Sequence, residues 1–148
     1  MVAIVQTTQP NFGASVSVPD VVTTNGARIV KPYAFPASDW SYAAAGSGIV
    51  NTTTAVTIKA AAAAGLKNYI TGIQIQTATL GGATELAIRD GAGGTVLFRT
   101  QLQTTALPLL TIDFPNPLRG TAATLLEVVT LTAVTGGVYF NAQGYVAA

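Results

Sequence analysis

The sequence predicts an all-β protein, an antiparallel β-sandwich of jelly-roll type with about eight strands, preceded by an extended N-terminal arm. Three observations lead to this prediction. Apolar and polar residues alternate with a period of two along several short stretches, as in strands with one buried face. Glycine-rich turns separate these stretches. The stretches also recur at the short spacing that is typical of sandwiches.

The first 37 residues are expected to form the arm, and residues 38–148 the sandwich domain. Four of the seven prolines lie in the arm, together with the turn signal Asn25-Gly26. Because proline cannot donate to a strand ladder, this segment favours extended structure, with short strands at 15–18 and 28–31. The alternative is that these are ordinary first strands packed on the same domain.

Within the domain, the alternation is clearest where Ile73 and Ile75 are separated by Gln74 and Gln76. A later stretch, 124–132, is almost continuously apolar and suits a strand buried on both faces. The alanine run 60–64 is too short for a stable helix, so a loop with at most one helical turn is expected there. The expected strands are 40–45, 53–59, 69–79, 84–89, 95–101, 110–114, 124–132 and 138–146.

Residues 66–99 are expected to form three consecutive antiparallel strands joined by two glycine turns. Gly81-Gly82 would supply the positive φ of a tight hairpin, and the segment 90–94 (Asp-Gly-Ala-Gly-Gly) would do the same for a longer turn. Further along, Pro115-Asn116-Pro117 is expected to end its strand, because neither proline can extend a ladder.

Composition excludes several classes of function. The chain has no cysteine and no histidine, which removes thiolate nucleophiles and the commonest metal ligand. Charged residues make up 9% of the chain, with a net charge of +1 and no run of either sign. Nucleic-acid binding depends on clustered positive charge, so no nucleic acid is expected as a partner. No apolar stretch is suited to a spanning helix or a signal peptide, and neither a cofactor nor a membrane is expected.

The residues offer little for catalysis. Ser47 lies in a Gly-Ser-Gly turn without a histidine to activate it. Asp113 and Glu127 would approach each other only if their strands paired, and a glycosidase needs two carboxylates at a set separation. The segment 90–95 lacks the ligands of a phosphate or calcium loop. We therefore expect no enzymatic activity, and a hydrolase is kept only as a third alternative.

Aromatic residues gather where the arm meets the domain, and they are the first candidates for contact with a partner. Three interpretations remain open: a plug in the core, an anchor in a protein interface, and a platform for sugar rings. Three basic residues are candidates for polar contacts with a partner or are solvated loop charges. The candidate interface residues are Arg28, Lys31, Tyr33, Phe35, Trp40, Tyr42 and Arg119.

Four segments of the second half resemble a group of small virion proteins of tailed phages: LKNYITGIQIQ (66–76), TVLFR (95–99), FPNPLRGT (114–121) and VYFNAQGY (138–145). The resemblance covers roughly Trp40 to Ala148. It implies a jelly-roll capsid decoration (cement) protein on the exterior of the virion, which clamps neighbouring subunits of the major capsid protein, commonly as a homotrimer. It implies no catalytic residue.

A second function of a different class is a carbohydrate-binding or receptor-binding module of a phage head or tail fibre. In that case the aromatic residues would stack on sugar rings, and the candidates are Trp40, Tyr42, Tyr139 and Tyr145. Exposure of these rings distinguishes the two functions.

Overall fold

The computed structural model describes residues 38–49 and 53–148, and the predicted arm of residues 1–37 lies outside them. The described part contains eight strands and no helix, close to the expected segments. The strands are β1 (Asp39–Tyr42), β2 (Val56–Lys59), β3 (Lys67–Thr77), β4 (Thr84–Asp90), β5 (Thr95–Leu102), β6 (Leu110–Arg119), β7 (Leu126–Thr130) and β8 (Val138–Ala147).

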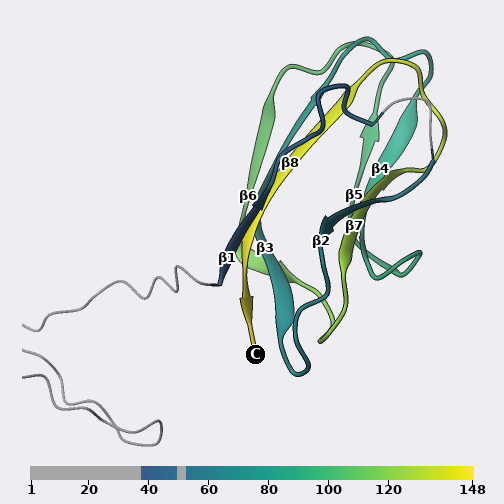
Figure 1. Ribbon diagram of the computed structural model, residues 1–148. Helices are drawn as coiled ribbons and strands as arrows, with labels where there is room; N and C mark the ends of the chain where they lie inside the picture. The colour runs from purple at the N-terminus through teal and green to yellow at the C-terminus, as the bar shows by residue number, and fades with distance from the viewer. Residues whose placement is uncertain (1–37, 50–52) are drawn as a thin grey trace, which may run out of the picture. The chain divides into compact units, whose positions relative to one another are not determined.

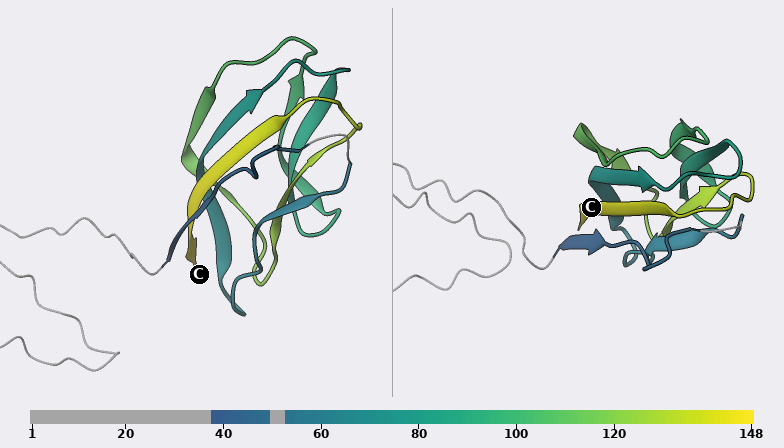
Figure 2. Two further views of the ribbon diagram at one scale, coloured as in Figure 1. Left: turned by 45° about the horizontal axis from the view of Figure 1, so that its top comes forward. Right: turned by 90° about the horizontal axis from the view of Figure 1, so that it is seen from above.

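The strands form two four-stranded antiparallel sheets. The first sheet has the order β1-β8-β3-β6, and the second sheet has the order β2-β7-β4-β5. Figures 1 and 2 show the two sheets facing each other as the layers of a sandwich. In this order each sheet takes strands from both halves of the domain, which is the arrangement of a jelly roll. The predicted fold class is therefore confirmed for the described residues.

The core lies between the sheets and is built from the apolar side of each alternating strand. Ile73 and Ile75 of β3 are at most 2% exposed, whereas Gln74 and Gln76 between them are exposed. Phe140 of β8 lies in the same core. Between the edge strands β5 and β6, which belong to different sheets, Phe98 of β5 meets Phe114 of β6 edge to face, with ring centroids 5.8 Å apart. This contact closes the core between two edge strands.

The central strand β7 is buried on both faces, as the apolar stretch predicts. All five of its residues are buried. Leu126 and Val128 belong to the core, while Val129 lies on the opposite face beside Ala87 of β4. A strand enclosed in this way favours apolar residues, and three of the five in β7 are apolar, with Glu127 and Thr130 as buried polar residues.

The link between β3 and β4 differs from the expected hairpin. These strands belong to different sheets, so the chain crosses the sandwich at Gly81-Gly82. Neither glycine has a positive φ. The nitrogen of Gly81 donates to the carbonyl of Thr135 at 3.0 Å, and a Cβ on Gly81 would collide with the Thr135 side chain. Gly81 is therefore required for close approach. By contrast, β4 and β5 do form a hairpin, and Gly91 and Gly93 in its turn have the predicted positive φ.

The prediction that Pro115-Asn116-Pro117 ends a strand is wrong, because β6 continues to Arg119. The register changes there: Asp113 pairs with Gly72 of β3, whereas Leu118 pairs with Ile70. The four residues 114–117 therefore have no register partner on β3 and lie opposite the single residue Thr71. An edge strand tolerates this because its prolines need not donate to a second neighbour.

Along residues 38–49 and 53–148 we find no helix with the length and hydropathy of a membrane span.

Candidate functional site

The structure does not bring the predicted interface residues together. Arg28, Lys31, Tyr33 and Phe35 lie outside the described residues. The remaining three occupy opposite edges of the first sheet. Trp40 and Tyr42 lie on β1, and Arg119 ends β6, with β8 and β3 between them. Three strand spacings correspond to about 14 Å, so these side chains form no common patch.

Trp40 is part of the core. It is 8% exposed, packs over Gly144 of β8, and its Nε1 donates to the carbonyl of Tyr145 at 3.2 Å. The ammonium group of Lys59 lies 5.9 Å from the ring centroid. This placement agrees with the core-plug interpretation. The half-buried Tyr42 packs against the same core, whereas Arg119 is exposed.

Two adjoining hollows lie on the outer face of the first sheet, the face turned away from the core. The Gly72 hollow has a volume of about 190 Å³, and all four strands of the sheet contribute to its lining. The Tyr145 hollow, of about 430 Å³, lies between β1, β3 and β8. Both hollows include Ser41 and Gln143, so they adjoin each other, and the two together are called the depression below.

A bulge in β3 explains why the depression is there. Thr71 has no register partner on β6 or β8, so Ile70 and Ile73 both face the core although they are three residues apart. As a result, Thr71 and Gly72 both lie toward the outer face. Thr71 lines the Tyr145 hollow, and Gly72 lines the hollow named after it.

Gly72 leaves open the space between two polar side chains. A Cβ at this position would lie 3.0 Å from Asp113 Oδ1 and 3.2 Å from Gln143 Nε2. These two groups come from the strands on either side, β6 and β8. Without a side chain on Gly72, both face the same small volume.

Amide and hydroxyl groups surround that volume. Asn141 Oδ1 accepts from the backbone nitrogen of Ala44 at 2.9 Å, which fixes the orientation of this amide. In the described part of the chain, the side chains of Gln74, Asp113 and Gln143 make no hydrogen bond or ion pair. Beside them, Tyr69 and Tyr145 stack with ring centroids 4.8 Å apart and an interplanar angle of 8°.

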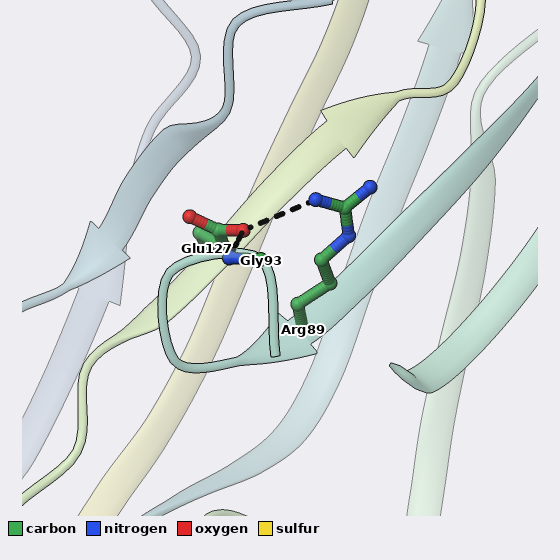
Figure 3. A network of polar contacts seen from close by, with 3 residues as sticks. All are labelled: Arg89, Gly93 and Glu127. Carbon is green, nitrogen blue, oxygen red and sulfur yellow. Dashed lines mark hydrogen bonds and ion pairs between the residues drawn. The ribbon is translucent and has the colours of Figure 1, made fainter. Parts of the chain in front are cut away.

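The outer face of the second sheet is organised differently, around one buried carboxylate. Glu127 of β7 is 5% exposed, and its Oε1 accepts from the nitrogen of Gly93 at 2.9 Å. The same oxygen lies 3.5 Å from Arg89 Nη1. Figure 3 shows Glu127 between the turn and the arginine. The carboxylate thus ties the β4–β5 turn to the centre of the sheet.

The carboxylates considered for hydrolysis do not converge. Asp113 and Glu127 belong to different sheets. Asp90 accepts from the nitrogen and the hydroxyl of Thr121, at 2.8 and 2.6 Å, and so ties the β4–β5 turn to the chain after β6. No cluster of three or more potential metal-ligating residues occurs in residues 38–49 and 53–148.

The amides of the depression were identified from the sequence only as the solvent side of β3 and β8. The alternation placed Gln74, Asn141 and Gln143 opposite apolar residues, which is correct. Their convergence depends on the register between β3 and β8 and on the bulge at Thr71. Neither is visible in a period-two pattern.

Comparison with known proteins gives no further identification: no family model, no curated protein and no solved structure matches the chain.

Proposed function

We propose that the protein is a non-enzymatic structural component of a tailed-phage virion. In this role it decorates the capsid exterior as a homotrimer and clamps neighbouring subunits of the major capsid protein. The resemblance of the four segments supports this proposal. Three of these segments fall on β3, β5 and β8. The fourth, 114–121, covers the second half of β6 and the first two residues of the following loop.

The observation that carries the proposal is an apolar strip where the chain enters the edge strand β6. Leu109 is 57% exposed and Leu110 is 41% exposed, the largest values among the exposed large hydrophobic residues in the described part of the chain. Neighbouring Ile112 and Phe114 are only partly buried. Contiguous exposed apolar side chains at a strand edge are typical of a protein contact.

This strip suits a symmetric assembly. In a closed ring every subunit makes equivalent contacts, and an apolar strip beside the rotation axis would be covered by its neighbours. Sparse charge fits such a contact, because charged residues are depleted at the centre of subunit interfaces.

The first test is the native mass of the full-length protein, measured by light scattering over a wide concentration range. The subunit is 15.0 kDa, so a trimer has a mass of 45 kDa (3 × 15.0). We expect a trimer for the wild type and a monomer for the double variant Leu109→Asp, Leu110→Asp. Leu131→Asp is the matched control, because Leu131 is also exposed but belongs to the loop after β7.

The second test is co-sedimentation with capsids assembled from the major capsid protein encoded in the same genome. Saturable binding at a fixed ratio of trimers to capsid subunits is expected. A protein that stays monomeric at high concentration and does not sediment with capsids contradicts the proposal.

A further inference from the structure

We propose that the depression on the outer face of the first sheet binds a neutral carbohydrate, with the Gly72 hollow as its central subsite. This binding goes beyond the structural role above and does not depend on it.

Polar side chains without protein partners converge on the Gly72 hollow. Gln74 of β3, Asp113 of β6 and Gln143 of β8 border one hollow, and none of them is hydrogen-bonded within the described part of the chain. Asn141 also lines the hollow, and its Oδ1 accepts from the backbone nitrogen of Ala44. A side-chain amide offers two donors and an acceptor, and a carboxylate offers several acceptor positions. Such a set matches a ligand that carries several hydroxyl groups.

The missing side chain of Gly72 leaves space between two polar groups. Asp113 Oδ1 and Gln143 Nε2 lie 3.0 and 3.2 Å from the position that a Cβ would occupy. A ligand atom cannot occupy the Cβ position itself, but a hydroxyl resting over Gly72 just beyond it would face a charged acceptor on one side and an amide donor on the other. Hydrogen bonds to charged groups are stronger than neutral ones.

The charge and the apolar surface of the depression together define the ligand class. Each hollow contains one acidic residue, Asp113 or Asp39, and no lysine or arginine. This disfavours phosphates, sulfated sugars and sialylated sugars. Tyr145, stacked on Tyr69, lines the second hollow and offers apolar ring surface next to polar groups. A pyranose ring has this mixture, with hydroxyls at its rim and C–H groups on its faces.

The residues proposed here for sugar recognition differ from the aromatic residues expected from the sequence. Trp40 cannot serve as a stacking platform on this face, since its ring lies in the core and its Nε1 is bonded to Tyr145. Of the other aromatic candidates, Tyr145 lines the second hollow and the half-buried Tyr42 lines the first, whereas Tyr139 lines neither. The amides of β3 and β8 take the leading role.

The experiment uses ¹⁵N-labelled full-length protein titrated with maltotriose, cellotriose, laminaritriose and chitotriose, and with 3′-sialyllactose as the anionic comparison. NMR follows the side-chain amide signals of Gln74, Asn141 and Gln143. We expect saturable shifts of these signals with at least one neutral oligosaccharide and none with 3′-sialyllactose.

Two variants test the location. Gly72→Ala fills the space between Asp113 and Gln143, and Asp113→Asn removes the charge from an exposed side chain without changing its shape. Each should raise the Kd about tenfold. Gly82→Ala, whose Cβ would meet nothing within 4 Å, and Gln76→Ala, on β3 beyond the hollows, should leave the Kd unchanged.

The absence of saturable shifts with all four neutral oligosaccharides would overturn the proposal. Binding of 3′-sialyllactose alone, or an unchanged Kd in a folded Asp113→Asn variant, would also overturn it. If Gly72→Ala fails to fold, Asp113→Asn still decides the outcome.

Discussion

The outer faces of the two sheets use their polar side chains in opposite ways. On the second sheet, Glu127 is bonded to Gly93 and Arg89, and Glu85 is paired with Arg99 at 3.4 Å. On the first sheet, Gln74, Asp113 and Gln143 surround a hollow and have no such partners among the described residues. Polar groups satisfied within the chain contribute to stability, whereas groups left open are available to another molecule. This contrast agrees with the proposal that the first sheet binds a ligand, although Asn141 on the same face is bonded to the backbone of Ala44.

The largest expected effect on stability is at Glu127. Removing the carboxylate in Glu127→Ala leaves the nitrogen of Gly93 without its acceptor and Arg89 without its partner. We expect a loss of about 2–3 kcal/mol in the free energy of unfolding. Chemical denaturation followed by fluorescence measures this loss. Glu127→Gln keeps an acceptor for Gly93 and should lose only about 1 kcal/mol. Equal losses in the two variants would show that the bond to the turn contributes little.

A smaller effect is expected for the exposed pair on the same sheet. The side chains of Arg99 and Glu85 are 53% and 41% exposed, so solvent screens their attraction. Glu85→Gln should lower the free energy of unfolding by about 0.2–0.5 kcal/mol at low salt. The difference from the wild type should disappear in 1 M NaCl. A difference that persists at high salt would mean that Glu85 acts through packing instead.

The smallest effect on stability is expected at Asp113, although it borders the proposed binding site. Because Asp113 has no partner in the described part of the chain, Asp113→Asn should change the free energy of unfolding by less than about 0.5 kcal/mol. Thermal unfolding of the variant beside the wild type checks this. A large loss would show that Asp113 supports the fold, and the contrast between the two outer faces would then fail.

The strands could be predicted from the sequence, because the pattern of apolar and polar residues within each segment indicates a strand. Alternation marks β3 and β8, and a mainly apolar stretch marks β7. Strand pairing could not be predicted in the same way, since a period of two identifies the buried face of a strand but not its neighbours. The two glycine links show the difference: Gly91 and Gly93 form a local turn, whereas Gly81 is needed for an approach to Thr135, 54 positions further along the chain.

The candidate site was less predictable than the fold for the same reason. Trp40 was predicted as a candidate interface residue because it is an aromatic residue near prolines. Its burial depends on the pairing of β1 with β8, which lies at the far end of the chain. Gly72 showed no sign of importance in the sequence, because its role depends on a bulge and on two neighbouring strands. Sites built across several strands need the register before their residues can be identified.

The proline bulge of β6 has a consequence for storage and overexpression. An exposed strand edge is a template on which further copies of a chain add without limit and grow into fibrils. Along β6 this growth is interrupted, because Pro115 and Pro117 have no amide hydrogen and residues 114–117 are out of register with β3. Only the short segment before the bulge presents a regular backbone. Concentrated protein should therefore resist conversion to amyloid through this edge, while the leucines beside it remain available for a contact of limited size.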